Sequence, residues 1–67
     1  MNIKKSIRRL MAEKDITQKQ IAESILVSDA FISGVVTGAK RISLQKVKAI
    51  CDAWDVKVSE FISWGEQ

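Results

Sequence analysis

The sequence predicts an all-α fold, a compact bundle of five short helices around one small core. Three observations support this prediction. Apolar residues recur at spacings of three and four along most of the chain, which is the period of an amphipathic helix. The chain has no proline and three glycines, so it lacks the usual turn residues of a β fold. Its 67 residues allow one domain, residues 1–67, with a single core.

The first expected helix is capped by Asn2 and runs to about Lys14. Its apolar face consists of Ile3, Ile7, Leu10 and Met11. Four basic residues lie off this face, namely Lys4, Lys5, Arg8 and Arg9. The chain then turns sharply at Asp15, a residue type that tolerates a left-handed backbone better than most.

Residues 17–38 predict two short helices joined by a tight turn. The first runs from about Gln18 to Ile25 and begins with a T-x-x-Q capping box, formed by Thr17 and Gln20. The second runs from about Asp29 to Thr37. Its expected core residues, with those of the preceding helix, are Ile21, Ala22, Ile25, Ile32 and Val35.

The link between these two helices is very short. Ser28 is the expected N-cap of the second helix, and Gly38 is a natural residue to end it. About three residues, Leu26 to Ser28, remain for the link. Such helices cannot lie antiparallel, so they should cross steeply, as in a helix-turn-helix. This geometry points to DNA.

The last third of the chain predicts a basic loop and two further helices. Residues 39–42 form the loop, and Ser43 caps a helix from Leu44 to about Trp54. The expected core stripe of this helix is Leu44, Val47, Ile50, Cys51 and Trp54. After a turn at Asp55, a short helix from about Val58 to Ser63 offers Phe61 and Ile62, and Trp64 follows it.

Charge is divided unevenly along the chain. Residues 1–48 carry ten Lys or Arg and four Asp or Glu, a net charge of +6, whereas residues 49–67 carry one Lys and four acids, a net charge of −3. One end of the protein is therefore suited to an anionic partner.

Several classes of function are disfavoured. With one cysteine, Cys51, and no histidine, the chain cannot form an internal disulfide, a zinc site or a Cys-His pair. No nucleophile-base pair or phosphate-binding loop is evident, so we expect no enzyme, no metal and no cofactor. No apolar run is long enough to span a membrane and no secretory signal is present, so we expect a cytoplasmic protein without membrane contact.

From Ile7 to Ile62 the sequence resembles the lambda-repressor-like, Cro/Xre-type family of DNA-binding proteins. The resemblance lies in ITQKQIAESI, the ISG run, TGAKRIS and AWDVKVSEFI. It implies five helices with residues 17–38 as the helix-turn-helix, and a Cro-like or phage-type regulator of transcription, most simply a repressor. Such proteins usually bind palindromic double-stranded DNA as homodimers. We expect no small-molecule ligand, because no second domain for sensing one is present.

Two departures from the family pattern carry physical consequences. The family usually has glycine at the turns occupied here by Asp15, Leu26 and Asp55, and Leu26 is the least comfortable substitute. The family also often has an arginine and a glutamate at the positions of Met11 and Val36. We infer that these two apolar residues pack on each other instead, which avoids desolvating two charges.

The resemblance assigns contacts with the DNA backbone and with base edges. Gln18 falls where the family's glutamine contacts a phosphate at a helix start. The expected phosphate contacts are Gln18, Lys19, Lys40, Arg41, Ser43 and Lys46, and these position the protein without sequence readout. The expected base contacts are Asp29, Ala30, Phe31, Ser33, Gly34 and Thr37.

Some of these assignments have alternatives. Ala30 and Phe31 could meet a thymine methyl group, whereas Asp29 could accept a bond from cytosine or simply favour the start of its own helix. Gly34 could allow close approach to the groove or relieve crowding against the preceding helix. With few long polar side chains on this helix, specificity leans on apolar contacts and DNA shape.

Two further expectations concern protein contacts. A homodimer is expected through the C-terminal segment 58–67, with Ile62 and Trp64 at the interface. Alternatively, Trp64 folds back and completes the monomer core. A different function, an antitoxin or a protein-binding adaptor with the same fold, is suggested by Phe31, which we expect to be exposed, and by Trp64.

Overall fold

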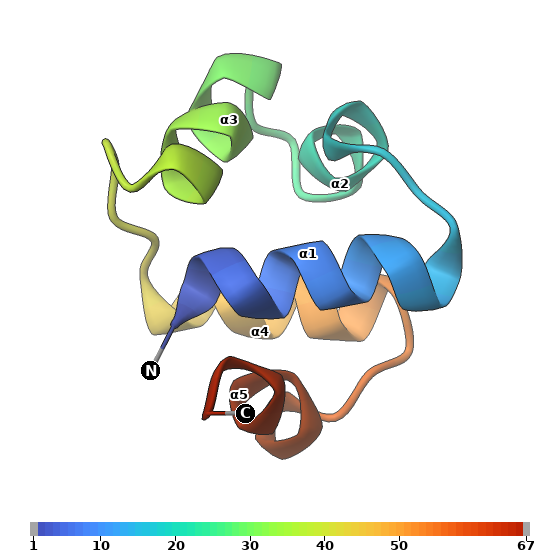
Figure 1. Ribbon diagram of the computed structural model, residues 1–67. Helices are drawn as coiled ribbons and strands as arrows, with labels where there is room; N and C mark the ends of the chain where they lie inside the picture. Colours follow the sequence, from blue (N-terminus) through green and yellow to red (C-terminus); the bar gives the residue numbers. More distant parts are fainter. Residues whose placement is uncertain (1, 67) are drawn as a thin grey trace.

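The computed structural model describes residues 2–66, and residues 1 and 67 of the expected domain lie outside them. Within this part of the chain all regular structure is helical, which confirms the all-α prediction (Figure 1). The five helices are α1 (Ile3–Lys14), α2 (Gln18–Ser24), α3 (Asp29–Thr37), α4 (Leu44–Ala53) and α5 (Val58–Glu66).

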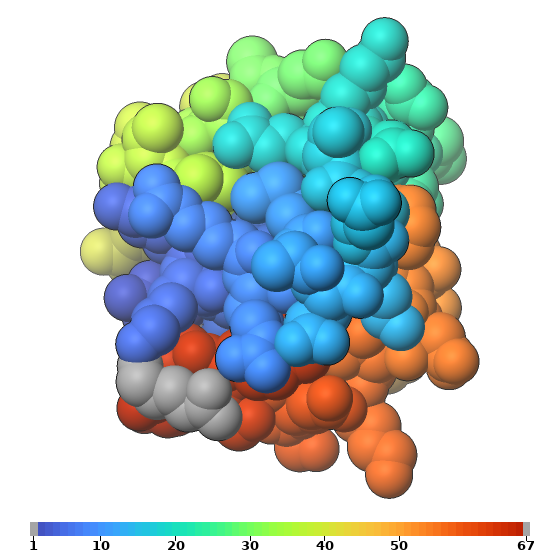
Figure 2. All heavy atoms as spheres, turned by 45° about the vertical axis from the view of Figure 1, so that its right-hand side comes forward, coloured from blue at the N-terminus to red at the C-terminus, as the bar shows by residue number. Residues whose placement is uncertain are grey.

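The helices are arranged around α1. Figure 1 shows α2 and α3 on one side of α1 and α5 on the other, with α4 running behind α1. Helix α1 packs against α3 and α5, and α4 packs against α2 and α5. The space-filling view in Figure 2 likewise places α2 and α3 at the end of the molecule opposite α5. The helix-turn-helix and the acidic C-terminal helix therefore occupy separate ends.

Side-chain caps fix where the first four helices begin. Asn2 Oδ1 accepts a bond from Lys5 N–H at 3.1 Å, at the start of α1. The predicted capping box of α2 is complete, because Thr17 Oγ1 accepts from Gln20 N–H at 3.2 Å and Gln20 Oε1 accepts from Thr17 N–H at 2.9 Å. These bonds satisfy N–H groups that have no partner within a helix, so they set the register of each element.

Three turns have a left-handed backbone at a residue other than glycine. The φ angles are 54° at Asp15, 60° at Leu26 and 55° at Asp55, the positions where the family pattern has glycine. An aspartate tolerates this conformation better than a leucine. Leu26 is also 93% exposed, so its side chain gains little from packing. The chain therefore carries strain at the turn between α2 and α3.

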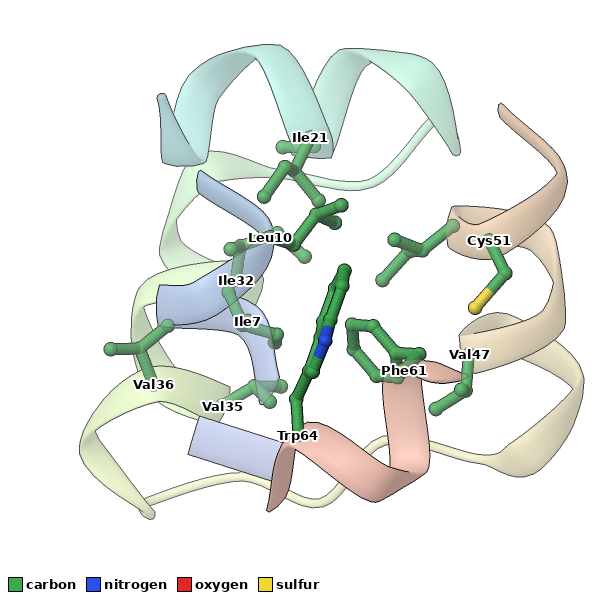
Figure 3. Packing of buried hydrophobic residues seen from close by; sticks show 12 residues of the cluster. Ile7, Leu10, Ile21, Ile32, Val35, Val36, Val47, Cys51, Phe61 and Trp64 are labelled. Atoms are coloured by element: carbon green, nitrogen blue, oxygen red, sulfur yellow. The ribbon is translucent and has the colours of Figure 1, made fainter. Parts of the chain in front are cut away.

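One cluster of buried side chains holds the five helices together. Its members are Ile7, Leu10, Ile21, Ala22, Ile32, Val35, Val36, Val47, Ile50, Cys51, Phe61 and Trp64. Figure 3 shows the indole of Trp64 reaching from α5 into the core beside Phe61. The two ring centroids are 6.2 Å apart and the ring planes are tilted by 59°, and this separation lies within the range of interacting aromatic pairs.

The C-terminal helix is longer than predicted. Helix α5 continues to Glu66 instead of ending at Ser63, so the expectation that Trp64 follows the helix is wrong. Three residues after Phe61, Trp64 lies on the same side of the helix and is 8% exposed. The guanidinium carbon of Arg9 lies 5.7 Å from its ring centroid. Burial of Trp64 thus completes a small core.

Close packing of α1 on α5 depends on two small residues. Ser6 is fully buried, and its Oγ donates to the Phe61 carbonyl oxygen at 2.7 Å. A Cβ placed on Gly65 would lie 2.6 Å from the backbone oxygen of Asn2. Any larger residue at position 65 would therefore separate the two helices.

Helix α4 begins at Leu44 as predicted and ends at Ala53, one residue before the expected end. Leu44 was expected in the core stripe, but its side chain is 64% exposed. Although it shares a side of the helix with Cys51, it lies two turns away at the helix start, beyond the core. Trp54 follows the helix as its C-cap and is half-buried, and its Nε1 donates to Ser24 Oγ at 3.1 Å. This bond ties the end of α4 to α2.

Candidate nucleic-acid interface

The predicted steep crossing of the two central helices is present. The chain bends by 119° between α2 and α3, within the range of a helix-turn-helix. The buried sides of both helices hold them in place, through Ile21 and Ala22 on α2 and Ile32, Val35 and Val36 on α3. The outer side of α3 remains available to a partner.

Small side chains dominate the outer side of α3. Asp29, Ala30, Ser33 and Thr37 are exposed, whereas Phe31 and Gly34 are half-buried. Ser28 Oγ caps the helix by accepting from Phe31 N–H at 3.1 Å. The Thr37 hydroxyl donates to the Gly34 carbonyl oxygen at 3.2 Å, within the helix. Short side chains let the helix backbone come close to a groove.

The loop after α3 carries two of the expected phosphate contacts. Gly38 ends α3 with a φ of 87°, as predicted, and Lys40 N–H then donates to the Gly34 carbonyl oxygen at 3.0 Å. This turn leaves Lys40 and Arg41 exposed beside α3. Ser43 Oγ accepts from Lys46 N–H at 3.2 Å and opens α4, so Lys46 projects from the first turn after the loop.

The remaining expected phosphate contacts, Gln18 and Lys19, belong to α2, which lies on the other side of α3 from the loop (Figure 1). Gln18 is the first residue of α2 and is half-buried, and Lys19 next to it is exposed. The expected phosphate contacts therefore come from three elements, namely α2, the loop and α4. Side chains that bind phosphates position a protein on DNA without reading its sequence.

Lys4 is a further basic residue near the loop, and it is not among the expected phosphate contacts. It lines an open groove of about 670 Å³ together with Lys40 and Arg41. The apolar part of the same groove is formed by Ile3, Val35 and Ile42. Helical spacing indicated only that Lys4 lies off the apolar face of α1, because the position of α1 relative to the loop is a tertiary property.

Not every base in the positive half of the chain belongs to this surface. Arg9 Nε lies 2.7 Å from Glu13 Oε1 and its guanidinium also covers Trp64, on the α5 side of α1. Lys48 Nζ lies 3.2 Å from Asp52 Oδ2 on α4. By contrast, within residues 2–66 neither Lys40 nor Lys46 forms an ion pair. Their charges remain available to an anion.

The structure gives Gly34 a role that neither sequence interpretation included. A Cβ placed on Gly34 would meet the Lys40 side chain, 2.9 Å from Cγ and 3.0 Å from Cδ. The nearest obstacle is thus the stem of a loop lysine, not α2. Sequence could not indicate this contact, because it depends on how the loop folds back over α3.

Other kinds of site find no support in the described part of the chain. Cys51 is fully buried, as predicted. Burial is the main cause that raises the pKa of its thiol, and the neighbouring Asp52 carboxylate raises this pKa further, so the reactive thiolate is disfavoured. No group of three or more potential metal ligands occurs within residues 2–66. None of these helices alone is long and apolar enough to cross a membrane, and α2 and α3 reach that length and apolarity only when joined across their bend.

A comparison with known families agrees with this geometry. The model of the Cro/C1-type HTH DNA-binding domain matches residues 6–67, most of the chain. The chain belongs to this family. Double-stranded DNA is accordingly its partner, and α2 and α3 are its helix-turn-helix. No curated protein matches the chain at a significant level.

Proposed function

We propose that the protein regulates transcription, most simply as a repressor, by inserting α3 into the major groove of an operator. The observation that carries this proposal is the outer side of α3. Small exposed side chains there lie beside a loop whose cations, Lys40 and Arg41, have no ion-pair partner within residues 2–66. In such an arrangement the cations bind phosphates while α3 approaches base edges.

The proposed base contacts are short. Ala30 offers a methyl group to thymine, Ser33 and Thr37 offer hydroxyl groups, and Asp29 can accept a bond from cytosine N4. None of these side chains forms the bidentate contacts that arginine, asparagine or glutamine make. A substantial share of the specificity therefore comes from the shape and flexibility of the operator.

The proposed functional unit is a homodimer on a palindromic operator. One recognition helix of nine residues contacts few base pairs, so useful affinity requires two half-sites about one DNA turn apart. Within the expected interface segment, Ile62 is half-buried and lies outside the core cluster, whereas Trp64 is buried in it. The dimer proposal therefore rests on Ile62 more than on Trp64.

We do not extend the proposal to an antitoxin or an adaptor. That alternative depended on exposure of Phe31 and Trp64. Trp64 is buried in the core, and Phe31 is half-buried beneath two lysines. No other surface aromatic residue within residues 2–66 takes their place, because Trp54 is held against α2.

Selection of bound fragments from a random pool of duplex DNA tests this function. The proposal predicts enrichment of one short motif repeated with two-fold symmetry, and binding that weakens steeply as salt is raised. A pool that stays unenriched, together with binding that does not depend on salt, would contradict it. Enrichment of a single unrepeated half-site would contradict the dimer alone.

A further inference from the structure

Phe31 has two cationic neighbours. Lys40 Nζ lies 5.9 Å from the centroid of its ring, and Lys46 Nζ lies 6.0 Å from it. The two lysines come from different elements, the loop after α3 and the first turn of α4. Both distances fall within the range at which an ammonium group is attracted to an aromatic ring. The ring thus has two cations near it, and each comes from an element other than α3.

Lys40 approaches the ring across position 34, which has no side chain. Its stem passes over Gly34, where a Cβ would come within 3.0 Å of two of its carbons. Its backbone is fixed by the bond from Lys40 N–H to the Gly34 carbonyl oxygen. Gly34 lies about one helical turn after Phe31, so the side-chain carbons and the ammonium group of Lys40 lie along the same side of α3.

Lys46 is placed by the start of α4. Ser43 Oγ accepts a hydrogen bond from the Lys46 backbone N–H, which fixes the first turn of α4. Phe31 packs against the core, which holds its ring in place near both lysines. Within residues 2–66 no carboxylate pairs with either ammonium group. Two like charges near one ring repel each other, and an anion bound between them would relieve that repulsion.

We propose that Phe31 is a positioning residue, which holds Lys40 and Lys46 toward the phosphate backbone of DNA, and that Gly34 is required for this arrangement. This inference rests on the proposed function and gives Phe31 a role other than the thymine contact that the sequence suggested. An aromatic ring attracts both cations without neutralising them. The lysines are thereby oriented in the free protein and keep their full charge for phosphate.

The test compares Phe31→Leu with Phe31→Tyr, which keeps the ring. Affinity is measured for the selected operator and for single-base variants of it. Phe31→Leu should weaken binding to every sequence by the same factor, roughly threefold to tenfold, and Phe31→Tyr should restore most of it. The slope of log affinity against log salt concentration should stay near that of wild type, because no charge is removed. A changed base preference in Phe31→Leu would overturn the proposal.

A double mutant separates positioning from independent contact. In a Lys40→Ala, Lys46→Ala background, Phe31→Leu should have almost no further effect on affinity. If its effect is instead as large as in wild type, Phe31 does not act through the lysines and the proposal is wrong. Gly34→Ala should weaken binding similarly to Phe31→Leu, and this loss should also disappear once Lys40 is alanine.

A measurement without DNA distinguishes this inference from the proposed function. In the free protein the ring should shift the side-chain methylene proton signals of both lysines upfield, and Phe31→Leu should abolish these shifts while its helical spectrum stays native. If the lysine signals of wild type are not shifted, the two lysines do not lie near the Phe31 ring and the proposal is wrong. Shifted signals without salt-dependent DNA binding would refute the phosphate-binding function instead, and with it the role proposed for the ring.

Discussion

Strain at Leu26 offers a sharp test of the turn between α2 and α3. A left-handed backbone costs a residue other than glycine about 1–2 kcal/mol. The φ of Leu26 is 60° and its side chain is 93% exposed, so replacing it sacrifices almost no packing. Glycine removes the steric cost but adds about 0.5–1 kcal/mol of backbone entropy in the unfolded chain. Leu26→Gly should therefore stabilise the fold by about 0.5–1 kcal/mol.

Thermal and urea unfolding, followed by circular dichroism, would measure this effect. For a domain of this size the expected rise in Tm is about 2–8 °C. Leu26→Ala is the matched control, because it removes the side chain but keeps a Cβ, and it should change stability little. The turn's own bonds, from Leu26 N–H to Glu23 and from Val27 N–H to Ala22, are available in both variants. If Leu26→Gly is no more stable than Leu26→Ala, the strain argument fails.

Three further predictions concern packing and assembly. Met11→Arg should destabilise the fold by about 1–3 kcal/mol and Val36→Glu should restore much of that loss in the double mutant, whereas additive denaturation midpoints would refute their contact. Gly65→Ala should lower stability by about 1–3 kcal/mol in urea unfolding, since its Cβ meets the backbone of α1; an unchanged midpoint would contradict that close approach. Trp64→Ala should lower the free energy of unfolding by about 3–5 kcal/mol. Ile62→Asp should keep this stability but weaken self-association, as measured by sedimentation. The reverse pattern would place Trp64 at the interface.

Local signals in the sequence were enough to predict where helices begin. Thr17, Ser28 and Ser43 each bind the backbone N–H three residues later, as their residue types and spacing suggested. The left-handed turns were also predictable, because they coincide with expected glycine positions. These features depend on interactions within about five residues, which the order of amino acids determines directly.

Features that depend on neighbouring elements were predicted less well. Leu44 shares its helix side with the core residues, yet the core ends before reaching it. Trp64 lies inside α5 because it packs with Phe61 and Arg9, and periodicity alone did not reveal that extra turn. The Met11 and Val36 contact stays a prediction, although Val36 is buried and Met11 packs against the core. Periodicity identifies the side of a helix but not what covers it.

The candidate interface shows the same division. Lys40, Arg41 and Lys46 are exposed, and their contacts with DNA phosphates stay predictions. The sequence did not show that Lys40 lies over Gly34 and meets Phe31, because that arrangement depends on the path of the loop. The pairing of Arg9 with Glu13, which removes one base from the positive half, was also missed.

The central claim is that the loop beside α3 binds DNA phosphates. Its most direct test is the salt dependence of affinity for wild type, Lys40→Ala, Arg41→Ala and a control, Lys57→Ala. Lys57 is exposed and lies among acidic residues on the α5 side of the molecule. In each loop variant, the slope of log affinity against log salt concentration should become shallower by roughly one unit, and binding to all DNA sequences should weaken alike. Lys57→Ala should leave the slope unchanged. Unchanged slopes in the loop variants, or an equal loss in Lys57→Ala, would contradict the claim.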